Sequence, residues 1–146
     1  MRFICLAVVA IVAGAAAGLF WPAHAQSYVS MDNPVSIDGV QAVCTGIGDE
    51  AQHDPRWPGY PIRVEFSNGG AQYLSGAHVV LSQGGKTLAA LDCAGPWVLF
   101  KLPPGDYKVD ATLLNNQGGG TRSAEFSPPA EGQKRVVLQF KLQPNQ

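Results

Sequence analysis

The chain has 146 residues, ten Lys and Arg against eleven Asp and Glu, and a formal net charge of −1 at pH 7. Hydrophobic residues make up 46% of it, which is enough for one domain with a real core. A balanced charge without any basic run argues against nucleic acid and anionic membrane surfaces as partners.

The first residues, 1–25, have the pattern of a secretory signal peptide. Arg2 supplies a positive start, residues 4–20 form an apolar run, and Ala23-His24-Ala25 is a small-x-small cleavage sequence. An uncleaved membrane anchor is the alternative, but the run is short, rich in Ala and Gly, and ends at the cleavage sequence. We therefore expect a mature chain that begins at Gln26, is periplasmic or secreted, and does not insert into the membrane.

Two cysteines, Cys44 and Cys93, remain after cleavage, because Cys5 leaves with the signal peptide. In an oxidising compartment an even pair of cysteines predicts a disulfide. Two separate buried thiols are the alternative. A redox or metal site at the cysteines is less favoured, because neither belongs to a CxxC motif.

The rest of the chain alternates short apolar-polar segments with clusters of Gly, Pro and Asn, and it contains no long amphipathic helix. Residues 26–37 form a leader that we expect to pair loosely or stay flexible, and residues 38–146 form the domain. We predict an all-β fold, a single antiparallel two-layer β-sandwich of about seven or eight strands. The strands are expected at residues 40–46, 60–67, 76–82, 87–93, 97–102, 107–113, 121–127 and 135–142.

The irregular stretch CTGIGDEAQHDPRWPGYP, residues 44–61, is the clearest candidate site. Asp49, Glu50, His53 and Asp54 offer ligands for a calcium or zinc ion, although their spacing matches no known metal-binding loop. In the structural alternative, Arg56 pairs with one of these acids and the neighbouring prolines stiffen the loop. The pattern favours a structural loop and leaves the metal site open.

Aromatic side chains in and near this stretch suggest a third role, contact with a ligand or partner. Trp57 lies in the irregular part, so we expect its ring to be exposed, with Arg56 and Tyr60 beside it. Trp57, Tyr60, Tyr73 and Trp97 could together form a platform on which sugars stack. Tyr60 and Trp97 fall in phase with alternating strands, however, which favours burial of both rings in the core.

Catalysis by a nucleophile has little support in the sequence. After the signal peptide the only histidines are His53 and His78, and no G-x-S-x-G motif is present. His78 alternates with the apolar residues of its strand, so we expect it to face solvent rather than to act as a base. We predict that the protein is not an enzyme and needs no cofactor, with a small metal-dependent hydrolase centred on Asp49–Asp54 as an alternative.

The stretch AGPWVLFKLPPGDYKVDATL, residues 94–113, resembles the carboxypeptidase regulatory-like, or transthyretin-like, β-sandwich domains. Such domains typically carry a short aromatic-rich strand and then a Leu-Pro-x-Gly-x-Tyr-x-Val turn into the next strand. Here Pro103 and Pro104 precede Gly105, which can take a positive φ, and Tyr107 would bury its ring and hydrogen-bond its hydroxyl. The resemblance implies a standalone exported bacterial member with an accessory or binding role.

Two chemically active relatives of those domains do not fit this chain. The transthyretin-like hydrolases of purine breakdown end in Tyr-Arg-Gly-Ser, whereas this chain ends in KLQPNQ, and isopeptide-forming domains need a Lys that the first expected strand lacks. The predicted function is therefore an exported, non-catalytic binding or accessory module for a protein or a cell-envelope component. A carbohydrate-binding module that uses exposed aromatics is the alternative.

Overall fold

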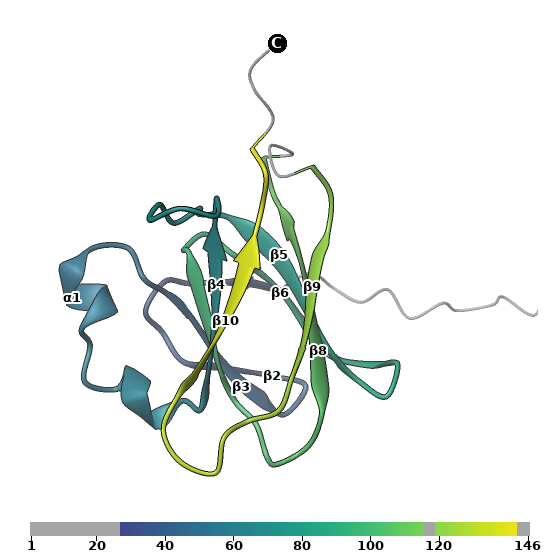
Figure 1. Ribbon diagram of the computed structural model, residues 1–146. Helices are drawn as coiled ribbons and strands as arrows, with labels where there is room; N and C mark the ends of the chain where they lie inside the picture. The colour runs from purple at the N-terminus through teal and green to yellow at the C-terminus, as the bar shows by residue number, and fades with distance from the viewer. Residues whose placement is uncertain (1–26, 116–118, 143–146) are drawn as a thin grey trace, which may run out of the picture.

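The computed structural model describes residues 27–115 and 119–142, which form two facing β-sheets (Figure 1). The expected signal peptide, residues 1–25, lies outside the described residues. Neither of the two short helical segments within the described ranges has the length and apolar character needed to cross a membrane.

The eight strands that the alternation predicts are all present, and two further short strands lie in the leader. In chain order the elements are β1 (Ser27–Val29), β2 (Val35–Ile37), β3 (Val40–Thr45), α1 (Asp49–Gln52), η1 (Trp57–Gly59), β4 (Ile62–Ser67), β5 (Ala77–Gln83), β6 (Lys86–Cys93), β7 (Trp97–Lys101), β8 (Tyr107–Leu113), β9 (Arg122–Phe126) and β10 (Lys134–Gln139).

The strands form two sheets of five. Sheet A has the order β1-β6-β5-β8-β9 and sheet B the order β10-β4-β7-β3-β2. The expectation of an all-β fold with two layers is confirmed, but two of its details are wrong. The described chain has ten strands, and the pairs β1–β6 and β10–β4 are parallel. A parallel pair needs a crossover instead of a hairpin, and β10 reaches β4 only after the chain has left β9 in the opposite sheet.

The hydrophobic core fills the space between the two sheets. Alternate residues of each strand point inward, as the period of two requires. Phe66 of β4 and Phe140, just after β10, meet edge to face with ring centroids 6.5 Å apart. The inward positions that are fully buried include Ile62, Val64, Phe66, Ala77, Val79, Leu81, Val98, Phe100, Val109 and Phe140. Burying one Val, Leu, Ile or Phe side chain contributes about 1.5–3 kcal/mol to the free energy of unfolding.

The leader pairs with both sheets along one open side of the sandwich. Strand β1 lies parallel to residues 91–93 of β6, β2 pairs with β3, and between them Met31 forms a bridge with Cys44. The backbone N–H of Asp32 also donates to the Cys44 carbonyl at 2.8 Å. The leader is therefore held in register on both sheets, which is a tighter arrangement than the loose pairing we expected.

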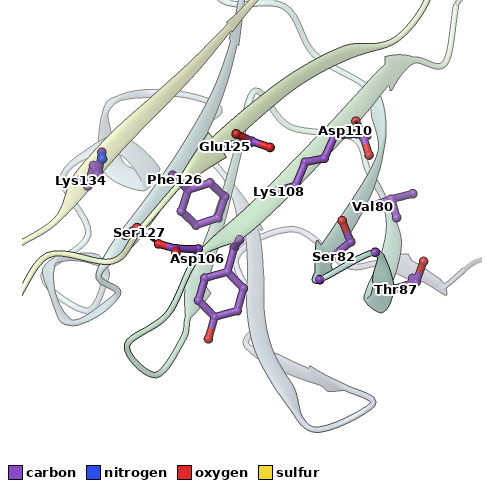
Figure 2. Close-up of a pocket in the computed structure, with 13 residues that line it drawn as sticks. Val80, Ser82, Thr87, Asp106, Lys108, Asp110, Glu125, Phe126, Ser127 and Lys134 are labelled. Carbon is purple, nitrogen blue, oxygen red and sulfur yellow. Dashed lines mark hydrogen bonds and ion pairs between the residues drawn. The ribbon is translucent and has the colours of Figure 1, made fainter.

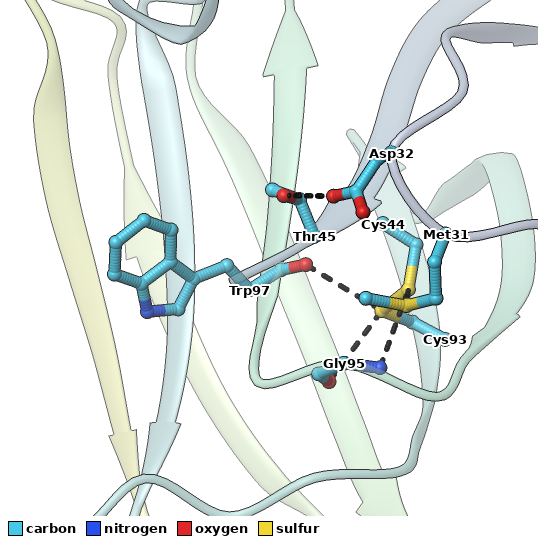
Figure 3. Close-up of a disulfide and its surroundings, with 7 residues drawn as sticks. All are labelled: Met31, Asp32, Cys44, Thr45, Cys93, Gly95 and Trp97. Atoms are coloured by element: carbon cyan, nitrogen blue, oxygen red, sulfur yellow. Dashed lines mark hydrogen bonds between the residues drawn. A yellow bond between two sulfur atoms is a disulfide. The ribbon is translucent and has the colours of Figure 1, made fainter. Parts of the chain in front are cut away.

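The predicted disulfide is present and joins the two sheets beneath the leader (Figure 3). Cys44 of β3 and Cys93 of β6 have Cα atoms 5.4 Å apart, within the range that a disulfide spans. The Met31 thioether sulfur lies 3.3 Å from Cys44 Sγ, and the backbone N–H of Gly95 donates to the same Sγ at 3.4 Å. The alternative of two separate thiols is thus excluded by the structure.

The turn before β8 has the geometry that the sequence motif predicts. Gly105 has a φ of 152°, a conformation that favours glycine. The Tyr107 ring is buried, and its hydroxyl donates a hydrogen bond to the Pro103 carbonyl at 2.8 Å. This bond fixes the turn that starts at Pro103 and Pro104 to the first residue of β8.

Candidate functional site

The candidate loop, residues 46–61, folds back over the outer face of sheet B. Gly46 makes this possible, because a Cβ atom there would lie 2.8 Å from the Trp97 ring. The loop places Trp57 and Tyr60 against Val43 and Leu99, and these four residues form a second, smaller hydrophobic cluster. The loop therefore acts as a cover for sheet B.

The expectation that Trp57 is exposed is wrong. Its ring is 3% exposed, its Nε1–H donates to the Ala51 carbonyl at 2.7 Å, and Tyr60 meets it edge to face at 6.0 Å. Gln133, from the β9–β10 connection, donates to the carbonyls of Trp57 and Tyr60 at 2.9 and 3.0 Å. An irregular backbone therefore does not imply an exposed ring here, because the loop has a sheet face to pack on.

Of the loop's charged side chains, Arg56 and Asp54 form a pair, as the structural alternative expected. The distance from Arg56 Nη2 to Asp54 Oδ2 is 2.6 Å, and the guanidinium stacks over the Trp57 ring with Cζ 4.4 Å from its centroid. Hydrogen bonds from Arg56 hold the pKa of the Asp54 carboxyl below its usual value, and the same side-chain bond raises the pKa of Arg56. Burial raises the pKa of the Tyr60 hydroxyl.

The possible metal ligands of the loop do not converge. Asp49 and Glu50 lie in the first turn of α1, His53 Nδ1 lies 2.9 Å from the Asp49 carbonyl, and Asp54 is paired with Arg56. Within residues 27–115 and 119–142, no group of three or more His, Cys, Asp or Glu side chains is placed to hold a metal ion. The geometry of this loop favours the structural role over the metal site.

The sequence did not predict that sheet B contains a buried acidic side chain, Glu65. Glu65 of β4 is fully buried, and Arg135 of β10 binds both of its carboxylate oxygens, at 3.1 and 2.6 Å. Arg63 Nε lies 2.9 Å from Glu65 Oε1, and the Tyr73 hydroxyl donates to the same oxygen at 3.5 Å. The bond to Glu65 raises the pKa of Arg135. Because Arg135 belongs to β10 and Glu65 to β4, this ion pair adds a side-chain link between two strands that are already paired.

The aromatic platform considered for sugars is not assembled. Trp57, Tyr60 and Trp97 are each no more than 4% exposed. Trp97 is enclosed by Arg63, whose Cζ lies 4.3 Å from the indole centroid, and by Tyr73, edge to face at 5.6 Å. Tyr60 and Trp97 are buried, as expected, but neither ring lies in the core between the sheets. Tyr60 joins the outer cluster with Trp57, and Trp97 packs against Arg63 and Tyr73.

The outer face of sheet A carries no such cover. His78 of β5 faces outward, as expected, and its Nδ1 lies 2.6 Å from Asp92 Oδ1 on β6. On the other side of His78 its partner in register is Thr112, whose hydroxyl lies 2.8 Å from that of Thr121. Tyr28 of β1 stands opposite Asp92. The outer face of sheet A therefore carries a row of polar side chains that runs from β1 to the residue just before β9: Tyr28, Asp92, His78, Thr112 and Thr121.

Beside this row the face is hollowed at the end where β5 turns into β6 (Figure 2). The hollow has a volume of about 790 Å³, and its charged lining residues are Asp106, Lys108, Asp110, Glu125 and Lys134. Lys108 and Asp110 are 3.4 Å apart, Ser123 donates to Asp110, and Ser127 donates to Asp106 at 2.5 Å. One feature of the sequence points to this hollow: along β8, polar residues alternate with buried ones.

No protein-family model matches this chain, and no curated protein matches it either.

Proposed function

We propose that the protein is an exported, non-catalytic binding module that contacts a protein or a cell-envelope component through the outer face of sheet A. The observation that supports this most directly is the contrast between its two outer faces. Sheet B is covered by residues 46–61, whereas sheet A is open and holds a hollow of about 790 Å³. This volume is typical of ligand sites, which lie at about 300–1,000 Å³.

Export is supported by the disulfide as well as by the signal-peptide pattern of residues 1–25. Cys44 and Cys93 are joined, and structural disulfides persist in oxidising compartments outside the cytoplasm. A periplasmic or secreted location therefore belongs to this proposal. So does the resemblance to the carboxypeptidase regulatory-like domains, since the Tyr107 turn has the geometry that this motif needs.

The metal-dependent hydrolase has less support than a binding role. Its residues are engaged elsewhere, because Asp54 is paired with Arg56 and His53 Nδ1 contacts the Asp49 carbonyl. His78 and Asp92 form a better-oriented pair, but they lie on an open sheet face that does not exclude water, which weakens general base chemistry.

Site-specific photo-crosslinking on the envelope tests the proposal. A photoreactive residue at Thr87, exposed at the rim of the hollow, should capture a partner protein or a polymer. The matched control is Val137, which is 41% exposed on β10 of sheet B. Adducts that form at Val137 and not at Thr87 would contradict the choice of face.

A further inference from the structure

We propose that the ligand of the outer face of sheet A is an extended, uncharged oligosaccharide. This inference rests on the proposed function and names the class of ligand for the same site. Four properties of the face support it: its hydrogen-bonding groups, their charge, the lack of a central apolar anchor, and an exposed ring at one edge.

The hydrogen-bonding groups of the hollow suit hydroxyls. A sugar hydroxyl is both a donor and an acceptor, so one ligand can satisfy carboxylates and ammonium groups alike. Glu125 and Lys134 line the hollow, and neither has a side-chain hydrogen bond or ion pair to another described residue. Asp106 and Asp110 are held in place by Ser127 and Ser123. Groups that are already fixed lose little entropy when they bind a ligand.

The charges of the hollow nearly cancel. Asp106, Asp110 and Glu125 stand against Lys108 and Lys134, and Lys108 lies beside both Asp110 and, across the strands, Glu125. Outside the hollow, Asp92 is paired with His78. Such a face produces little field to attract a strongly basic or strongly acidic partner. Its electrostatic complement is a polar ligand without net charge.

The centre of the face lacks the anchors that protein interfaces use. Binding energy between proteins concentrates in a few buried Trp, Tyr, Arg or large apolar residues near the middle of the contact. At the middle of this face stand Val80 of β5 and its partner Ala90 of β6, both small and half-buried. A polar surface whose middle holds only small apolar residues is a poor fit for a protein and a good fit for a sugar chain.

An aromatic ring stands at the edge of the face. Tyr28 is 69% exposed, and no other large hydrophobic residue described as exposed lies on a strand of sheet A. Its neighbour Val29 is buried, so Tyr28 points to the outer side, where its ring can lie against the C–H face of a sugar. Strand spacing and rise put Tyr28 about 19 Å from Lys108. One ligand can reach both only if it is extended.

Calorimetric titration of the mature protein with neutral hexasaccharides tests the inference. Suitable probes are gluco-, manno- and chito-oligosaccharides, with an oligogalacturonate as the charged comparison. At least one neutral hexasaccharide should bind, about tenfold more tightly than its trisaccharide, and the affinity should change less than about twofold between low and high salt.

Two variants locate the two ends of the ligand. Glu125→Gln, in the hollow, should weaken both the tri- and the hexasaccharide by about tenfold, because it alters the hollow itself. Tyr28→Ala should weaken only the hexasaccharide, because the shorter ligand does not reach the ring. Val137→Ala, on sheet B, should leave both affinities unchanged.

Two results would overturn the inference in different ways. If no neutral oligosaccharide binds but the photoreactive residue at Thr87 captures a protein, the ligand class is wrong and the binding face stands. If no oligosaccharide binds and Thr87 captures nothing while Val137 does, the proposed function fails as well.

Discussion

The outer faces of the two sheets differ in what lies over them, although both sheets have five strands. Sheet B carries Trp57 and Tyr60 on Val43 and Leu99, whereas sheet A carries polar side chains open to solvent. The difference follows from the lengths of the connections. Residues 46–61 separate β3 from β4, but only Gly84 and Gly85 separate β5 from β6, and two residues cannot fold back over a sheet.

Under the proposed function, the two outer faces divide stability and binding between them. A covered face adds hydrophobic burial, while an open polar face adds little to the free energy of unfolding and remains available to a ligand. Substitutions on sheet B should therefore change stability, and substitutions on sheet A should change binding.

Trp57→Ala should produce the largest loss of stability. It removes the centre of the cover on sheet B and the hydrogen bond to Ala51, and it should cost about 3–5 kcal/mol in the free energy of unfolding. Chemical denaturation measures it. Tyr28→Ala is the control on sheet A, and its effect should stay within about 0.5 kcal/mol. Equal losses in the two variants would contradict the distinction between the faces.

Replacing both Cys44 and Cys93 by alanine should cost about 2–4 kcal/mol, because the bridge closes a loop across a sequence separation of 49 residues. Cys44 lies just before the cover, so hydrogen exchange should increase more in residues 46–61 than in β8. Thiol titration of the unfolded, unreduced wild type should find no free thiol. Two free thiols per chain would show that the bridge does not form.

Arg135→Met tests the buried acid of sheet B. Glu65 would keep Arg63 but lose its bidentate partner, and a buried group that loses a partner costs about 1–3 kcal/mol. Lys108→Met is the control, because Lys108 contacts Asp110 on the exposed face of sheet A and such pairs contribute about 0–1 kcal/mol. A smaller loss at Arg135 than at Lys108 would show that Glu65 is not held as described.

The smallest effect concerns the pH dependence of the exposed pair on the cover. The pKa of Asp54 is lowered in the folded state by its hydrogen bonds to Arg56. Its stabilising contribution is therefore complete above the unfolded value of about 3.9, and it is lost as the pH falls through the lower folded value. An NMR titration should find the Asp54 carboxyl below its usual pKa, and Arg56→Gln should move it back up. No change in Arg56→Gln would assign the shift to another cause.

Much of the fold could be predicted from local patterns. The alternation located all eight strands of the domain, and the LPPGDY turn predicted the positive φ of Gly105 and the hydrogen bond of Tyr107. Both depend on residues close together in the chain. The disulfide could be predicted because only two cysteines, Cys44 and Cys93, follow the stretch 1–25 that has the signal-peptide pattern.

The site was less predictable, because burial on the outside of a sheet depends on distant segments. Glu65 alternates with apolar residues in the sequence, as an exposed position would, and it is enclosed by Arg63 of its own strand, Tyr73 and Arg135 of the neighbouring strand. Trp57 lies in an irregular stretch, and only the pairing of β3 with β7 places Val43 and Leu99 beneath it. The hollow depends likewise on the juxtaposition of β5, β8 and β9 with Lys134 of β10.

The sequence by itself determined the strand positions, the turn before β8 and, among the cysteines after residue 25, the pair Cys44–Cys93, because each depends on side-chain period, backbone preference or simple counting. Tertiary structure alone decided the parallel edge strands, the two-sheet pairing of the leader, the cover on sheet B and the open face of sheet A. These features depend on which segments meet after folding. The conformational preference of a residue can be read from the residue and its neighbours in the chain. The energy of pairing two distant strands cannot, because it depends on segments far apart in the sequence.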